Sequence, residues 1–165
     1  MERPLLRTEG LIIRPTGDSD LAGIIACGRD QLISRMPWFG IGFRDEWAPA
    51  WIERAKECWG TGPWVFSVLD EQERYLGAVA LMRSSTDNSI ELAYWTLAEH
   101  RNKGVLKRAL SAVMAWAPDH IEASRFWAKT APDNLPSQRA LLASGFILVA
   151  QDKAVFFDWM GKKRR

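Results

Sequence analysis

Residues 90–110 read IELAYWTLAEHRNKGVLKRAL, and this stretch decides the fold. Its first part, Ile90 to Leu97, is a nearly continuous apolar run, which is typical of a strand buried on both faces. After a short polar loop, apolar residues recur with the spacing of an amphipathic helix from Gly104 to Ala117, which Pro118 should end. The stretch therefore predicts a central strand, a tight loop and a helix packed back onto the sheet.

Hydrophobic spacing and turn residues place the other elements on either side of this unit. Strands are predicted at residues 11–14, 64–69, 75–82, 90–97, 125–129, 146–150 and 154–160. Helices are predicted at residues 18–28, capped by Asp18 or Ser19, and at residues 45–59, 104–117 and 134–144. Strands joined by short turns favour antiparallel pairing, and strands joined through a helix favour parallel pairing. We expect an α/β (α+β) fold, a mixed, mostly antiparallel sheet of about seven strands with four helices, in the order β-α-α-β-β-β-α-β-α-β-β.

Length and composition exclude several classes of protein. The 165 residues suit one domain, which we expect over residues 1–160, followed by a basic tail at residues 161–165. We expect no membrane span and no signal peptide, and the two distant cysteines indicate neither a disulfide framework nor a metal site. A cytoplasmic protein is the simplest interpretation. The four basic residues at the end leave the rest of the chain slightly acidic, which argues against a nucleic-acid partner.

The loop before the third predicted helix has the properties of an anion site. The first amides of a helix lack internal partners and carry partial positive charge. Gly104 has no side chain to keep a phosphate from the backbone, and Arg101 and Lys103 add positive charge nearby. The loop therefore predicts a phosphate site, against the plainer alternative of a solvated basic turn.

In order and spacing, the chain resembles the GCN5-related N-acetyltransferase (GNAT) superfamily, most closely its RimJ/RimL-type branch, over residues 9–160. The resemblance rests on LIIRP at residues 11–15, IELAYW at residues 90–95, RNKGVL at residues 101–106, and Asn134 with Ser137 before Gly145-Phe146. One position departs from the pattern, because the family has Gly or Ala where this chain has Leu106.

The resemblance implies acetyl-CoA as co-substrate and direct transfer of its acetyl group to a primary amine in a ternary complex, without a metal. The amine would belong to a protein or peptide N-terminus or to a small molecule. The pantetheine arm would run beside the strand backbone, and the pyrophosphate would bind the loop that follows. The implied donor-site residues are Trp95, Thr96, Leu97, Arg101, Asn102, Lys103, Gly104, Val105, Leu106 and Asn134.

The chemistry needs a group that takes a proton from the amine and a group that supports the leaving thiolate. Glu91 lies in the most apolar strand and is our candidate base, and Ser137 matches the family position that serves the thiolate. Plainer roles stay open for each. Glu91 could be paired with an arginine, Ser137 could satisfy a free helix amide, and Asn134 could be a helix cap instead of a ligand of the CoA arm.

Five of the nine tryptophans lie between residues 38 and 64. Trp38 and Phe39, in a loop rich in proline and glycine, are our candidates for an aromatic acceptor pocket, together with Glu91. Trp47, Trp51 and Trp59, with Ala55 between the last two, follow a four-residue repeat, which favours packing beneath an amphipathic helix.

Two other functions stay open. Within the same class, the acceptor amine could belong to an aminoacyl-nucleotide or an aminoacyl-tRNA. In a different class, the chain would be a non-catalytic acyl-CoA-binding or interaction module, with the basic tail as a docking segment. A homodimer is also among the alternatives.

Overall fold

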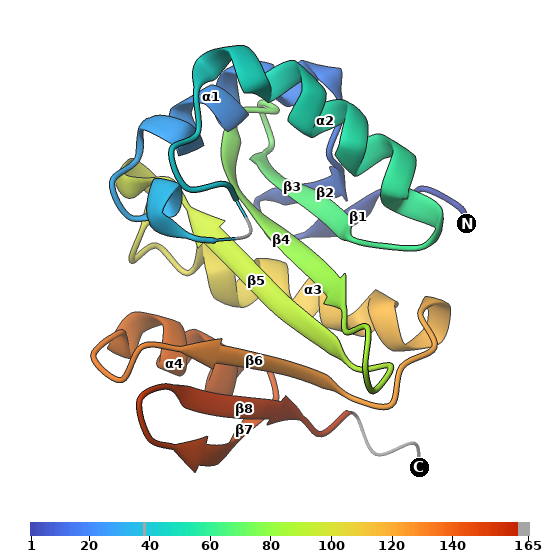
Figure 1. The fold of residues 1–165 in the computed structure, drawn as a ribbon, viewed down its shortest axis with the longest axis vertical. Coiled ribbons are helices and arrows are strands. Elements are labelled where there is room, and N and C mark those ends of the chain that lie inside the picture. Colours follow the sequence, from blue (N-terminus) through green and yellow to red (C-terminus); the bar gives the residue numbers. More distant parts are fainter. Residues whose placement is uncertain (38, 162–165) are drawn as a thin grey trace.

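The computed structural model describes residues 1–37 and 39–161, and its centre is one eight-stranded sheet (Figure 1). The strands are β1 (Leu6–Thr8), β2 (Leu11–Pro15), β3 (Trp64–Asp70), β4 (Tyr75–Arg83), β5 (Ile90–Thr96), β6 (Phe126–Thr130), β7 (Phe146–Gln151) and β8 (Val155–Trp159). Their order in the sheet is β1-β2-β3-β4-β5-β6-β8-β7. Of the neighbouring pairs, β5 and β6 are parallel and the others antiparallel, so the predicted mixed sheet is confirmed, with β1 as an additional strand.

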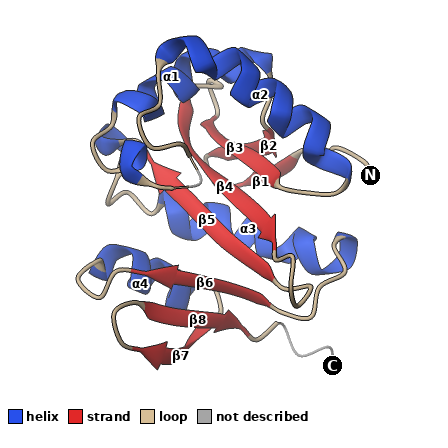
Figure 2. Cartoon of the chain, viewed as in Figure 1, coloured by secondary structure: helices blue, strands red, loops and turns tan. Residues whose placement is uncertain are grey.

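Four helices cover the two faces of the sheet (Figure 2). They are α1 (Leu21–Arg29), α2 (Ala48–Glu57), α3 (Val105–His120) and α4 (Leu135–Ala143). One apolar cluster joins α1 and α2 to β3–β5, and a second joins α3 and α4 to the opposite face. Alternate residues of β5 enter the two clusters, with Leu92 on the α3 side and Ala93 on the α1/α2 side. This double burial explains the nearly continuous apolar run in its sequence.

The bounds of all four helices differ from the sequence prediction by one to three residues at each end. Pro118 does not end α3, which continues to His120, and the N–H of Ile121 still donates to the carbonyl of Ala117 at 2.8 Å. A proline this near the end removes one helical hydrogen bond, and burial of the preceding turns holds the helix together. Asp18 and Ser19 do not cap α1 either, because they belong to a short 3₁₀ turn that precedes it.

The connection from β6 through α4 to β7 also differs from the expected parallel pairing. Strands β6 and β7 are joined through α4 but do not pair, because β8 lies between them and pairs antiparallel with both. The parallel rule holds only for β5 and β6, which are joined through α3. The one parallel pair of the sheet is therefore the one next to the predicted anion loop.

Residues 162–165, most of the predicted basic tail, and Trp38 lie outside the described residues. Within the described part, no helix is long and apolar enough to cross a membrane.

Candidate functional site

Strands β5 and β6 separate after a short paired stretch. They pair only from Ile90 with Phe126 to Leu92 with Ala128, although β5 continues to Thr96 and β6 to Thr130. We call this unpaired part, residues 93–96 of β5 and 129–130 of β6, the β5–β6 split. Since an unpaired strand edge keeps free N–H and C=O groups, the split can accept an added extended chain.

The peptide groups of β5 alternate between its two neighbours. The N–H of Ile90 donates to the carbonyl of Arg125, just before β6, at 2.8 Å, and the N–H of Leu97 donates toward β4 at 2.9 Å. By this alternation Tyr94 and Thr96 turn their peptide groups toward the split, and Trp95 turns its own toward β4. The split is therefore lined by the backbone of Tyr94 and Thr96, within the segment that the resemblance indicated.

The chain then turns sharply into α3. Asn102 and Gly104 both have left-handed backbone conformations, with φ of 60° and 71°. Gly104 is the N-cap of α3 and makes no side-chain cap hydrogen bond, and a Cβ built on it would meet nothing within 4 Å. The first amides of α3, which have no partners within the helix, therefore face open space beside Gly104. This arrangement suits a phosphate group.

The side chains of the loop brace its backbone. Arg101 donates from Nε to the carbonyl of Thr96 at 2.9 Å and from Nη2 to Oδ2 of Asp30 at 2.7 Å. Lys103 donates to the carbonyl of Glu99 at 2.7 Å. These contacts give Arg101 and Lys103 a structural role in addition to the positive charge for which the sequence selected them.

Arg108 was missed by sequence reasoning. Its guanidinium donates to the carbonyl groups of Glu9, Lys103 and Gly104 and so ties the loop to the turn between β1 and β2. Its position on the first turn of α3 was a signal, but its contact with Glu9 joins residues far apart in the sequence.

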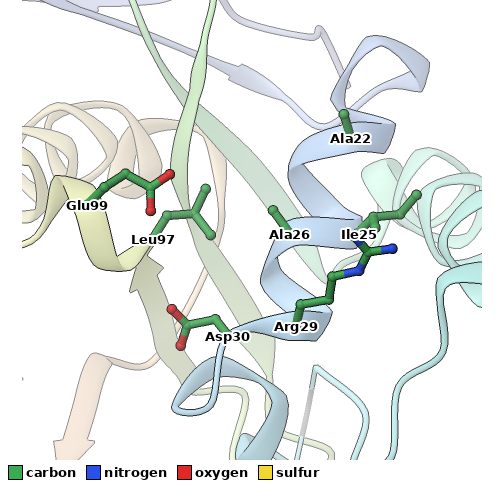
Figure 3. Close-up of a pocket in the computed structure, with 7 residues that line it drawn as sticks. All are labelled: Ala22, Ile25, Ala26, Arg29, Asp30, Leu97 and Glu99. Carbon is green, nitrogen blue, oxygen red and sulfur yellow. The ribbon is translucent and has the colours of Figure 1, made fainter.

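A pocket of about 500 Å³ lies between α1 and the segment that follows β5 (Figure 3). Ala22 and Ala26 of α1 face Leu97 and Glu99 across it, and Asp30 lies at its lower edge. Burial alone would raise the pKa of Asp30, but hydrogen bonds from Arg101 and from backbone N–H groups outweigh it and lower that pKa. The pocket is thus bordered by the ion pair that anchors the loop.

Replacing Arg101 by Met should lower the free energy of unfolding at pH 7 by about 2 kcal/mol, because it leaves a carboxylate of 8% exposure without its cation. Since folding depresses the pKa of Asp30, this stabilisation is present above about pH 4 and is lost as the pH falls through the lower pKa of the folded state. Urea unfolding at a series of pH values measures it. A difference between the two proteins that persists unchanged at the lowest pH would contradict the assignment.

Glu91 lies on the face of the sheet that α1 and α2 cover, as do Ala93 and Trp95. Its side chain is 25% exposed, and Oε1 lies 3.3 Å from Nζ of Lys129 on β6. The sequence left open an ion pair between Glu91 and an arginine. In the structure Glu91 does form an ion pair, and its partner is a lysine of the neighbouring strand.

Ser137 lies on the opposite face, where α4 packs. Its Oγ is 2.7 Å from the hydroxyl of Tyr94, and its N–H donates to Oδ1 of Asn134, which is the N-cap of α4. Burial raises the pKa of Tyr94 to about 12, so this phenol keeps its proton at neutral pH. Tyr94 was missed in the sequence, although its place three residues after Glu91 already put the two side chains on opposite faces of a strand.

Phe39 lies in the core between α2 and the sheet. It is 2% exposed, and its ring centroid is 4.8 Å from that of Phe43, 5.6 Å from that of Trp51 and 5.8 Å from that of Trp95. Its ring therefore packs against Trp95 of β5 in the core on the α1/α2 side of the sheet. Trp38, its companion in the predicted pocket, lies outside the described residues, so no position is given for it.

The three tryptophans of the predicted helical face have different surroundings. Trp59 is buried against Phe66, with ring centroids 5.0 Å apart, as core packing requires. Trp51 is partly buried against the Phe39 cluster. Trp47 is 46% exposed, so for this residue the prediction of core packing is wrong. The reason is that Trp47 precedes α2, whose buried side is formed by Ala48, Ile52 and Ala55.

The split thus separates two kinds of chemistry. A carboxylate that can take a proton lies on one face of the sheet, and two protonated hydroxyl groups that can donate lie on the other. The backbone edge of β5 lies between these two faces. The open start of α3 lies beyond the end of the split. Within residues 1–37 and 39–161, no group of three or more His, Cys, Asp or Glu side chains could hold a metal ion.

Several solved structures that are similar to this chain in fold carry the name acetyltransferase. The ribosomal-protein-S5-alanine acetyltransferase of Vibrio fischeri superposes with a TM-score of 0.79 at 17% identity, over 98% of this chain and 99% of that chain. RimL, a ribosomal L7/L12 alpha-N-protein acetyltransferase solved in complex with coenzyme A, superposes with a TM-score of 0.76 at 15% identity, over 95% and 96%. At these identities the likeness concerns the fold.

Sequence comparisons give the family. The chain is 33% identical over 89 residues to the uncharacterized N-acetyltransferase YjdG of Bacillus subtilis (strain 168), which is 54% of this chain and 53% of that relative. The match thus spans about half the length of the relative. The model of the acetyltransferase (GNAT) domain matches residues 10–147, from just before β2 into β7. The chain therefore belongs to the GNAT acetyltransferase family.

Proposed function

We propose that this chain transfers an acetyl group from acetyl-CoA to a primary amine in a ternary complex formed at the β5–β6 split. The observation that carries the proposal is the split itself, where the N–H and C=O of Tyr94 and the N–H of Thr96 face no partner strand and lead to the open N-terminus of α3. An extended amide chain that ends in a pyrophosphate matches this sequence of binding groups. Family membership and the coenzyme A complex of RimL support acetyl-CoA as that ligand.

The donor site follows from the backbone. The N–H and C=O of Tyr94 and the N–H of Thr96 would pair with the pantetheine amides as an added strand would, while the carbonyl of Thr96 already accepts from Arg101. The amides of residues 103–106 would receive the pyrophosphate. Leu106, which departs from the family pattern, packs its side chain against the α3-side core. Its N–H can therefore still face a phosphate, which supports the donor site despite the departure.

The two faces of the split divide the proton chemistry. An amine that enters on the α1/α2 face would give its proton to Glu91, and the attack would place negative charge beside the N–H of Tyr94. The leaving thiolate would receive a hydrogen bond from the Tyr94–Ser137 pair on the other face. These assignments make Glu91 and Ser137 catalytic, with Tyr94 as a further member of the site.

For the acceptor we favour the N-terminal amine of a protein or peptide, in keeping with the RimJ/RimL-type branch. Two neighbours of the fold are named as acetyltransferases of ribosomal proteins, and one of them, RimL, is named as an alpha-N-protein acetyltransferase. We further propose that residues 1–160 act as one domain in the cytoplasm. An aminoacyl-nucleotide is the second candidate acceptor, and the slightly acidic body of the chain favours a small conjugate over a whole tRNA.

The pH dependence of Tyr94 provides one test of the thiolate side. With a pKa of about 12, Tyr94 stays protonated from pH 7 to pH 10, so its ionisation should not limit the rate there. Tyr94→Phe should lower kcat by about 10-fold through the lost hydrogen bond and leave the shape of the pH–rate profile unchanged. An alkaline limb below pH 10 that is present in the wild type and absent from Tyr94→Phe would contradict this role.

The direct test of function mixes the full chain with acetyl-CoA and a panel of amines and follows release of free thiol. The panel contains peptides with free N-termini, polyamines and an aminoacyl-nucleotide analogue. We expect thiol release equal to the amount of acetylated amine formed, with peptide N-termini preferred. Binding of acetyl-CoA without turnover of any amine would favour the non-catalytic module and overturn the proposal.

A further inference from the structure

A primary amine of the chain itself lies at the candidate base. Nζ of Lys129 is 3.3 Å from Oε1 of Glu91, and the Lys129 side chain is 53% exposed. Phe126 and Ala128 enter the α3-side cluster, so alternation puts Lys129 on the same face of the sheet as Glu91. The amine therefore lies on the face where we expect acceptor amines to enter.

Lys129 also lies where the split begins. Ala128 is the last residue of β6 that pairs with β5, and Lys129 is the next residue along the strand. An extended donor that pairs with Tyr94 and Thr96 enters from the wide end, beside α3, so its thioester would point toward this narrow end. The Lys129 amine is thus placed beside both the candidate base and the expected path of the acyl group.

An aromatic surface supports the amine. Nζ of Lys129 lies 5.8 Å from the ring centroid of Trp127, and the ring of Phe156 stacks near that of Trp127 at 6.2 Å between centroids. The indole N–H of Trp127 donates to Ser89 at 3.0 Å, which fixes the ring. Asp158, another carboxylate of this surface, pairs with Arg125 at 3.3 Å. Glu91 is therefore the carboxylate that pairs with Lys129.

We propose that the chain acetylates its own Lys129. This inference rests on the proposed function and adds an acceptor within the chain. The ammonium of Lys129 gives a proton to Glu91, and the nitrogen lone pair then attacks the thioester carbonyl of acetyl-CoA. The C–N bond forms and the C–S bond breaks, so acetyl-CoA and the lysine ammonium yield acetyl-lysine, the CoA thiol and one proton. The neutral amide can no longer form the ion pair with Glu91.

The experiment incubates the purified full-length protein with acetyl-CoA alone and follows the acetylation of each lysine by peptide mass spectrometry. Lys107 and Lys153 of the same molecule report the uncatalysed reaction of a surface lysine with acetyl-CoA. We expect Lys129 to react at least about 10-fold faster than either, and the rate to fall at least about 10-fold in Glu91→Gln. The first-order rate constant for acetylation of Lys129 should not depend on protein concentration, because the acceptor belongs to the same chain.

Lys129→Arg is the matched variant, since arginine keeps a cation beside Glu91 but is not an acceptor amine. The acetylation that remains in this variant should come only from its other lysines, at the rate found for Lys107 and Lys153 of the wild type. If Lys129 of the wild type reacts no faster than those two lysines, or equally fast in Glu91→Gln, the inference is overturned.

A parallel thiol assay with the amine panel separates this inference from the proposed function. Turnover of an external amine with Lys129 unmodified overturns self-acetylation alone. Modified Lys129 without any external turnover supports self-acetylation and overturns the proposed external acceptor. Neither reaction overturns both.

Discussion

Glu91→Gln should lower kcat for acetylation of an external amine by about 100-fold or more, with the KM for acetyl-CoA changed by less than about 2-fold. The amide has nearly the same size as the carboxylate but cannot take the proton of an ammonium. The groups proposed to bind the donor, the backbone of Tyr94 and Thr96 and the start of α3, lie in the split and beyond it, so their binding should not change. Steady-state kinetics in both substrates measure the two constants.

A matched variant makes this prediction specific to Glu91. Glu122→Gln, which changes an exposed carboxylate after α3, is the matched control and should behave as the wild type. Full activity in Glu91→Gln would remove Glu91 from the role of base.

Phe39→Ala should lower the free energy of unfolding by about 3–5 kcal/mol, the usual cost of removing a buried phenylalanine ring. The ring is 2% exposed and lies within 6 Å, between centroids, of Phe43, Trp51 and Trp95. Because domains of this kind are stable by only about 5–15 kcal/mol, the variant should be close to its unfolding threshold. Equilibrium urea unfolding followed by tryptophan fluorescence measures the difference.

Trp47→Ala is the control for this second prediction. Trp47 is 46% exposed, so its removal should change the free energy of unfolding by less than about 1 kcal/mol. If Phe39→Ala is as stable as the wild type and raises the KM of the acceptor, the core assignment fails and the acceptor pocket expected from the sequence is supported instead.

Much of the fold could be predicted because residues 90–110 follow strong local rules. A run of apolar residues indicated a strand buried on both faces, and 3.6-residue spacing indicated α3. Strand β1 was missed because three residues, LRT, carry no usable alternation. The position of β8 between β6 and β7 was missed because pairing between distant strands depends on the whole sheet.

The candidate site was predictable where local structure defines it. The loop before α3 could be recognised because glycine and helix-start chemistry act within a few residues. The partners of its side chains could not, since Arg101 reaches Asp30 and Arg108 reaches Glu9 across the fold. The Tyr94–Ser137 contact likewise requires α4 to pack against β5.

The abundance of tryptophan illustrates how composition misleads without a fold. Trp59 is buried in the α3-side core, and the indole of Trp95 donates to Cys27 at 3.0 Å on the other side of the sheet. Trp127, for which the sequence predicted no role, lies beside Lys129 at the start of the split. An aromatic residue from the C-terminal half of the chain therefore lies beside the amine that pairs with the candidate base.

Hydrogen exchange with and without acetyl-CoA tests the central claim most directly, because it needs no knowledge of the acceptor. If the donor binds the β5–β6 split, the amides of Tyr94 and Thr96 and those of residues 103–106 should exchange more slowly with acetyl-CoA present, and β1 should be unaffected. The account would be contradicted if those amides exchange at the same rate with and without acetyl-CoA while protection develops around the pocket between Ala22 and Asp30.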